Sequence, residues 1–185
     1  MTKDRIWLGT SNKHKVKEAS EILSEFGIKL EHYPMNRVEI QSDKLEEVAL
    51  FSLKQVTDTF PICVEDAGLF IDSYKGFPGP YSSYILECLG NEGILKLMNG
   101  LSNRAARYIS AVAYRDERGI KIFNGSVEGK IAQSIRGEHG FGFDPIFIPL
   151  EGNGRTFGEL SDLEKNSISH RARSFRALGR SLAEI

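Results

Sequence analysis

A polar run directly after the first apolar segment of the chain could bind phosphate. If a helix begins here, its first backbone N–H groups carry partial positive charge, and nearby hydroxyl, amide and ammonium groups add further donors. Short polar runs are also typical of an ordinary helix cap, so the run alone leaves both interpretations open. It consists of Thr10, Ser11, Asn12, Lys13, His14 and Lys15.

Three acidic residues elsewhere could supply carboxylates to such a site. Glu65 and Asp66 follow the apolar run Ile62–Val64, which predicts a buried strand, and ligand crevices of open α/β sheets lie where such strands end. Neighbouring side chains of an extended backbone point to opposite faces, so we expect one of this pair to enter the site. Glu39, in the segment Val38–Gln41, is a further carboxylate. Solvated turn or edge residues are the alternative interpretation.

The segment Phe141, Gly142, Phe143 and Asp144 could receive a planar base. Two aromatic rings separated by a glycine offer stacking surfaces, and the missing side chain allows close approach to the backbone. Aromatic residues at this spacing are also common in cores, which is the alternative interpretation.

Cations gather where the last helix is predicted to begin, at Lys165, His170 and Arg171. Positive charge opposes the helix dipole at that end, and a local conflict of this kind is typical of functional sites. A solvated helix face would have the same composition.

Hydrophobic periodicity predicts the elements that must position these residues. The order combines strand–helix–strand units with an antiparallel hairpin, which favours an α/β fold with a mixed sheet. We expect strands at Ile6–Leu8, Ile28–Tyr33, Val38–Gln41, Ile62–Val64 and Leu69–Ile71, a hairpin over Arg107–Ile131, and helices over Val16–Phe26, Leu45–Val56, Ser83–Leu89, Asn91–Met98 and after Ser169.

Length and composition restrict the class of protein. With 185 residues and 20.7 kDa, we expect one domain spanning 1–185. Lys and Arg number 24 against 25 Asp and Glu, so no net field favours polymeric nucleic acid. No apolar run reaches the roughly 18 residues of a membrane span and no leader pattern is visible, so we expect a cytoplasmic protein without membrane attachment. The motifs GxxxxGK[ST], GxGxxG, GxSxG and HExxH are absent from the sequence.

Five motifs in fixed order, spanning about residues 6 to 180, together carry a specific resemblance. They are Thr10-x-Asn12-x-x-Lys15, Glu65-Asp66-Ala67-Gly68-Leu69, Phe77-Pro78-Gly79-Pro80-Tyr81-Ser82, Phe141-Gly142-Phe143-Asp144-Pro145-Ile146-Phe147 and Glu164-Lys165-Asn166-x-x-Ser169-His170-Arg171. In this order the chain resembles the inosine triphosphate pyrophosphatase family. The resemblance implies hydrolysis of ITP, dITP and XTP to the monophosphate and pyrophosphate. It also implies an elongated α/β fold with a long mixed sheet, flanking helices and two lobes around a central cleft, a requirement for Mg²⁺, and a homodimer.

The resemblance further assigns roles to individual residues. Asp66 would be metal ligand and general base, with Glu39 as the second metal ligand. The remaining roles would be phosphate binding by Thr10, Ser11, Asn12, Lys13, His14, Lys15 and Lys165, a backbone contact from Ala67, the base pocket from Phe141, Gly142, Phe143 and Asp144, and base reading by His170 and Arg171.

The sequence departs from the family pattern at three positions. Ala67 replaces a frequent Ser, Phe143 replaces a frequent Tyr or Trp, and Ser52 stands where some relatives have a lysine, with Lys54 nearby and unassigned. Two alternatives to the implied activity are a pyrophosphatase for pyrimidine or modified triphosphates and a module that senses nucleotides without turnover.

Overall fold

The computed structural model describes residues 5–36 and 38–184, with helices and strands in mixed order. The strands are β1 (Arg5–Gly9), β2 (Lys29–Tyr33), β3 (Ile62–Ile71), β4 (Pro78–Gly79), β5 (Ala105–Asp116), β6 (Gly119–Ile131) and β7 (Phe147–Pro149). The α-helices are α1 (Lys13–Ser24), α2 (Leu45–Lys54), α3 (Ser82–Leu97), α4 (Asp162–Ile168) and α5 (His170–Ala183). Single 3-10 turns cover Asp72–Tyr74, Asp144–Ile146, Leu150–Gly152 and Phe157–Glu159.

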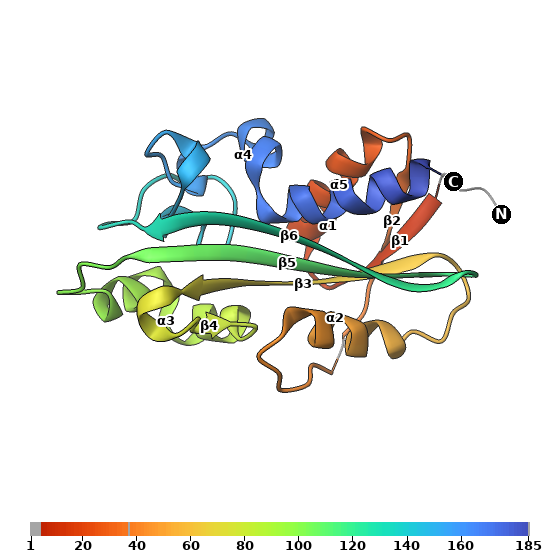
Figure 1. Ribbon diagram of the computed structural model, residues 1–185, viewed down its shortest axis with the longest axis horizontal. Helices are drawn as coiled ribbons and strands as arrows, with labels where there is room; N and C mark the ends of the chain where they lie inside the picture. Colours follow the sequence, from red (N-terminus) through yellow and green to blue (C-terminus); the bar gives the residue numbers. More distant parts are fainter. Residues whose placement is uncertain (1–4, 37, 185) are drawn as a thin grey trace.

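The strands form one mixed sheet in the order β2-β1-β3-β5-β6-β7, with β4 paired to β3. β1 is parallel to β2 and β3, whereas β5 is antiparallel to both β3 and β6. β6 has 13 residues, and at about 3.3 Å per residue it extends roughly 40 Å. The long strands run almost the full length of the molecule (Figure 1). The predicted elongated α/β fold is therefore confirmed.

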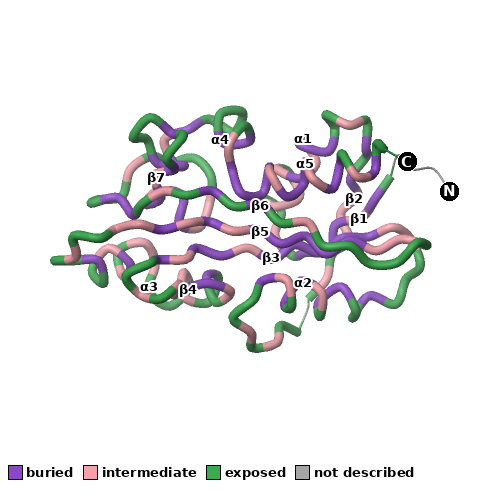
Figure 2. The backbone as a smooth tube through the Cα atoms, in the orientation of Figure 1, coloured by how far each residue is buried: buried purple, intermediate pink, exposed green. Residues whose placement is uncertain are grey.

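Helices cover both faces of the sheet. α1 and α5 pack together on one face, with α5 against β5 and β6, while α2 packs against β3 and β5 from the other face (Figure 1). The core is divided along the strands: Ala106 and Tyr108 of β5 belong to one hydrophobic cluster, whereas Val112 and Tyr114 belong to another. Buried segments accordingly occur in both halves of the molecule (Figure 2). Within the described ranges, no helix has the length and apolar character needed to cross a bilayer.

Local sequence signals account for several elements. The hairpin lies where the period-two pattern predicts it, with Asp116 paired to Gly119 across its turn. Gly90 has φ 63° and interrupts α3, so the two predicted helical pieces are confirmed as two parts of one element.

Three predicted strands differ from the structure. Ile62–Val64 and Leu69–Ile71 are parts of the continuous strand β3, so Glu65 and Asp66 lie in its middle and not at its end. Val38–Gln41 is not a strand, because the backbone of Val38 hydrogen-bonds to the side chain of Gln55 instead of to a neighbouring strand.

Candidate active site

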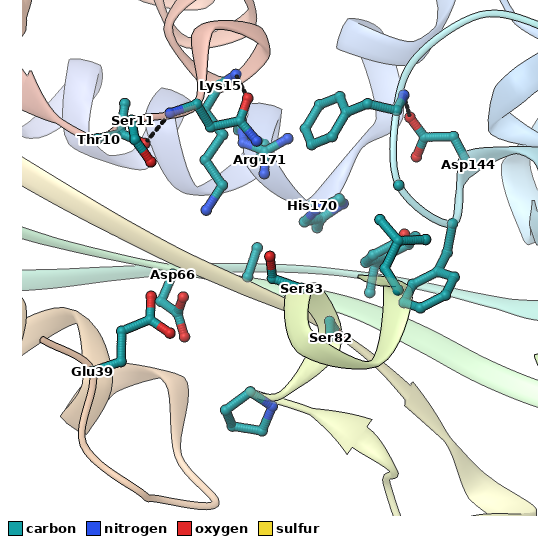
Figure 3. A pocket seen from close by; sticks show the side chains of 18 of the residues that line it. Thr10, Ser11, Lys15, Glu39, Asp66, Ser82, Ser83, Asp144, His170 and Arg171 are labelled. Atoms are coloured by element: carbon teal, nitrogen blue, oxygen red, sulfur yellow. Dashed lines mark hydrogen bonds between the residues drawn. The ribbon is translucent and has the colours of Figure 1, made fainter. Parts of the chain in front are cut away.

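A cavity of about 370 Å³ lies between the elements on the two faces of the sheet. β1 pairs with β3 only at Ile62 and Cys63, so β3 continues beyond the end of β1 and its edge borders the cavity. Figure 3 shows Glu39 and Asp66 on one side, with Thr10, Ser11, Lys15 and Arg171 on the other. The lining residues are Thr10, Ser11, Asn12, Lys15, Asn36, Glu39, Asp66, Ala67, Pro80, Ser82, Ser83, Leu86, Tyr108, Phe141, Gly142, Phe143, Asp144, His170 and Arg171.

The polar run after β1 forms the N-terminus of α1, as predicted. Asn12 is the N-cap residue, and its Oδ1 accepts the backbone N–H groups of His14 at 2.9 Å and Lys15 at 3.2 Å. The N–H of Asn12 donates to Thr10 Oγ1 at 3.0 Å. These three amides are therefore satisfied within the turn, and the predicted contribution of helix amides to phosphate binding is smaller than the sequence suggested.

Two members of the run have other positions. Lys13 is exposed and does not line the cavity. The His14 ring stacks on Phe141 with centroids 5.1 Å apart and an interplanar angle of 21°. His14 thus connects the turn that was predicted to bind phosphate with the loop that was predicted to receive the base.

Glu65 and Asp66 point to opposite faces of β3, as expected for neighbours in a strand. Asp66 lines the cavity, beside Glu39 (Figure 3). Glu65 pairs with Lys15 Nζ at 2.8 Å and accepts hydrogen bonds from Ser110 Oγ and Arg171 Nε at 2.9 and 3.1 Å. Burial alone would raise the pKa of Glu65, but the charges of Arg171 and Lys15 hold it well below the ordinary value. Glu65 is therefore ionised, and it forms ion pairs with Lys15 and Arg171.

The carboxylates of Glu39 and Asp66 point toward one another from the β2–α2 connection and from β3 (Figure 3). Among the residues that the structure describes, no group of three or more His, Cys, Asp and Glu side chains is arranged to hold a metal ion. Two carboxylates nevertheless suit a hard divalent cation that takes its remaining oxygen ligands from water and phosphate. By donor chemistry, the pair fits such an ion.

A buried network of charges supports the opposite side of the cavity. Glu18 lies 2.6 Å from both Lys165 Nζ and Arg171 Nη1, and Lys165 also pairs with Asp144 at 2.7 Å. Burial would raise the pKa of Glu18, but the charges of Arg171 and Lys165 hold it below its ordinary value. Asp144 is buried, and there burial outweighs the Lys165 charge and raises the pKa of Asp144.

The position of Lys165 differs from the prediction that it contacts phosphate. Its side chain is 3% exposed, between Glu18 and Asp144, and it does not line the cavity. Its Nζ lies 4.9 Å from the centre of the Phe141 ring. Lys165 therefore supports the aromatic loop, and Arg171, 5.3 Å from the same ring centre, is the cation that lines the cavity there.

The two predicted base-pocket aromatic residues have different environments. Phe141 is half-buried, between His14 and Lys165, and its backbone N–H donates to Asp144 Oδ2 at 2.8 Å. Phe143 is only 2% exposed and packs in the hydrophobic cluster that contains Leu69 and Tyr108, although it touches the cavity. Phe141 is therefore the more exposed of the two rings, although His14 and Lys165 already contact it, and Phe143 packs mainly in the core.

His170 is a buried, neutral side chain at the cavity wall. Its ring stacks on Tyr108 with centroids 4.5 Å apart and an interplanar angle of 6°. Burial, and then the charge of Arg171, lower the pKa of His170 well below its ordinary value. Among the described residues, none hydrogen-bonds to its Nδ1. His170 therefore contributes an uncharged ring to the cavity wall, with its Nδ1 enclosed by the protein.

Gly125 allows the start of α5 to lie directly on β6. A Cβ atom at Gly125 would be 2.2 Å from the His170 carbonyl oxygen and 2.5 Å from the Ser174 nitrogen. Both are backbone atoms that cannot rotate away, so only glycine fits. This contact brings His170 and Arg171 to the cavity.

Several residues of the site were not predicted from the sequence. Glu18 follows Lys15 by three positions on α1, and this helical spacing was the available signal for it. Tyr108 belongs to the predicted hairpin and gave no local signal. Ser82 lies in one of the five motifs without an assigned role, and its Oγ accepts the N–H of Leu69 and donates to the Gly79 carbonyl. Ala67 lines the cavity as predicted.

Comparisons with known proteins relate nearly the whole chain to one family. Residues 6–181 match the family described as the Ham1 family. A protein of Ignicoccus hospitalis named dITP/XTP pyrophosphatase is 46% identical over 187 residues, covering 99% of each chain. One of the same name from Hyperthermus butylicus is 43% identical, covering 97% of this chain and 95% of the relative. The solved structure of a HAM1 protein from Coxiella burnetii has a TM-score of 0.83 at 28% identity, covering 98% of this chain and 99% of that one.

Proposed function

Because this chain belongs to the Ham1 family, we propose that it hydrolyses dITP, ITP and XTP to the nucleoside monophosphate and pyrophosphate. Such an enzyme removes deaminated purines from the nucleotide pool. Full-length relatives named dITP/XTP pyrophosphatase support the reaction class and the purine substrates.

One observation in the structure carries the proposal. The cavity has two acidic side chains, Glu39 and Asp66, on one side and the cations Lys15 and Arg171 on the other. A nucleoside triphosphate needs cationic partners for its phosphates and carboxylates for the cation that accompanies them. The volume of the cavity, about 370 Å³, is also within the usual range for small-molecule sites.

We infer that Glu39 and Asp66 hold Mg²⁺, which neutralises phosphate charge when bound. Asp66 is the proposed general base, accepting a proton from water as the water attacks the α phosphorus. The bond between the α phosphorus and the α–β bridging oxygen then breaks, and pyrophosphate leaves. Lys15 is placed to offset the charge that develops on the leaving oxygens.

Base selection is assigned to Phe141, His170 and Arg171. Phe141 offers a ring for stacking, and the guanidinium of Arg171 donates hydrogen bonds without accepting any. A 6-keto oxygen accepts such a bond, whereas the 6-amino group of adenine does not. The mismatch costs about 1 to 3 kcal/mol for each unmatched buried group. We therefore expect dITP, ITP and XTP to be preferred over ATP.

The experiment is an incubation of dITP, ITP, XTP, ATP, GTP and CTP with Mg²⁺, followed by chromatography of all products. We expect monophosphate and pyrophosphate from the first three. Orthophosphate with a diphosphate product contradicts cleavage at the α phosphorus. Tight binding without any product supports a sensing module, and preference for CTP supports a pyrimidine enzyme.

The homodimer, the cytoplasmic location and the single domain of residues 1–185 stay predictions. Sedimentation measurements test the first.

A further inference from the structure

The carboxylate of Glu39 is carried by a segment without regular secondary structure. In the part of the β2–α2 connection that the structure describes, no residue is helical or in a strand, and both Val38 and Glu39 are exposed. Asp66, by contrast, belongs to the long strand β3. The relative position of the two carboxylates therefore depends on how this segment is held.

Gln55 holds the segment at the residue before Glu39. Its Oε1 accepts the Val38 N–H at 3.0 Å, and its Nε2 donates to the Val38 carbonyl at 2.6 Å. One side-chain amide thus satisfies both backbone polar groups of Val38, as a neighbouring strand would. This carbonyl belongs to the planar peptide unit between Val38 and Glu39. The hydrogen bond from Gln55 therefore fixes the orientation of that peptide plane, next to the Cα atom of Glu39.

Gln55 is itself fixed relative to Asp66. It is the C-cap residue of α2, and its N–H bonds to the Ser52 and Leu53 carbonyls. α2 packs through Leu53 and neighbouring apolar residues against Ile62 and Val64 of β3. Val64 lies two residues before Asp66 on the same strand. Through these contacts, Gln55 links the backbone next to Glu39 to β3, the strand that carries Asp66.

We propose that Gln55 is a positioning residue for the cation site, holding Glu39 where it can share a divalent ion with Asp66. This role rests on the proposed function, in which those two carboxylates are the metal ligands. Gln55 touches neither substrate nor metal in this role and acts through the backbone of Val38. Nothing in its local sequence indicates this, because its partner lies 17 residues earlier in the chain.

The test variant is Gln55→Met, which keeps the length of the side chain and removes both hydrogen bonds. The matched control is Gln133→Met, the same change at an exposed position that does not line the cavity. Three measurements apply to both variants: hydrogen exchange at the Val38 amide, Mn²⁺ binding by electron paramagnetic resonance with a non-hydrolysable α,β-methylene ITP, and the Mg²⁺ concentration for half-maximal dITP hydrolysis.

In Gln55→Met, we expect faster exchange at Val38 and Mn²⁺ binding weakened about three- to tenfold, as the loss of one or two modest hydrogen bonds implies. The Mg²⁺ requirement should rise in parallel, while kcat at saturating Mg²⁺ stays within about twofold, because Asp66 and Lys15 are unaffected. Gln133→Met should match the parent in all three measurements.

Faster exchange with unchanged Mn²⁺ binding overturns the positioning role, and unchanged exchange overturns the contact itself. A parent protein that binds no Mn²⁺ overturns the metal site and the role of Gln55 together. A parent that binds Mn²⁺ but leaves dITP intact overturns the proposed function alone, and the exchange and Mn²⁺ measurements still decide the role of Gln55.

Discussion

The ammonium nitrogen of Lys15 lies 2.8 Å from Oε2 of Glu65, so the lysine in the first turn of α1 is paired with a carboxylate of β3. Glu65 also bonds to Arg171, and Glu18 joins Arg171 to Lys165. The cations along this side of the cavity are therefore held in one buried network. Their positions are set by the protein itself, which would reduce the cost of ordering them on binding the proposed substrate.

Loss of the Glu65 charge should destabilise the protein strongly. In Glu65→Gln, the buried guanidinium of Arg171 loses one of its two carboxylate partners, and breaking a buried ion network typically costs about 3 to 5 kcal/mol. Urea denaturation gives the free energy of unfolding. Glu25→Gln, which breaks an exposed pair with Arg176, is the control and should cost at most about 1 kcal/mol. Equal losses in the two variants would contradict the structural importance of the network.

Asp66→Asn tests the proposed general base. The amide cannot accept the proton from water, so we expect kcat for dITP to fall by about 10² to 10⁴ while nucleotide binding is largely retained. Steady-state kinetics and calorimetric titration with the α,β-methylene analogue separate these effects. Asp72→Asn is the control, because Asp72 is exposed and pairs with Arg107 away from the cavity lining. Turnover at the parent rate in Asp66→Asn would remove Asp66 from this role.

The two aromatic residues of the base loop should respond differently to truncation. Phe141→Ala removes an accessible stacking surface worth about 1 to 3 kcal/mol, so KM for dITP should rise about tenfold or more. Phe143→Ala leaves a cavity in the core and should lower the free energy of unfolding by about 3 to 5 kcal/mol. Kinetics and denaturation are measured on both variants. A large KM change in Phe143→Ala without loss of stability would reverse the assignment.

His170 should make stability depend on pH. Its folded pKa is lowered from 6.5, so as pH falls below that value the unfolded state binds a proton that the folded state refuses. Stability should therefore decrease on acidification, from this group by about 1.4 kcal/mol per pH unit between the unfolded and folded pKa values. Denaturation at several pH values, compared with His170→Gln, isolates the contribution. If the free energy of unfolding changes with pH equally in the parent and in His170→Gln, then His170 does not remain neutral in the folded protein.

Local patterns predicted much of the fold because they depend on neighbours in sequence. Periodicity located α1, the hairpin β5–β6 and both parts of α3, and Asn12 caps α1 where the polar run indicated a helix start. The α/β class with a mixed sheet followed from the order of these elements. Motif resemblance, more than spacing, singled out the residues that line the cavity.

The errors arose where distant residues decide the outcome. β3 continues through Glu65 because Lys15 and Arg171 neutralise that side chain inside the protein, and neither lies near it in sequence. Val38–Gln41 alternates like a strand, but Gln55 supplies the hydrogen bonds of a partner strand. Lys165 is enclosed by Glu18 and Asp144, which no local pattern could reveal.

Glu65 and Asp66 are consecutive residues. Glu65 nevertheless pairs with Lys15 and Arg171, whereas Asp66 lies beside Glu39 in the cavity. The distance between their Cα atoms is set by a single trans peptide, about 3.8 Å, and not by packing between the lobes. If the lobes rotate about the sheet when a nucleotide enters, these two attachment points move as one unit. Covalent geometry thus keeps the Cα atoms of Glu65 and Asp66 at the same spacing throughout such a motion.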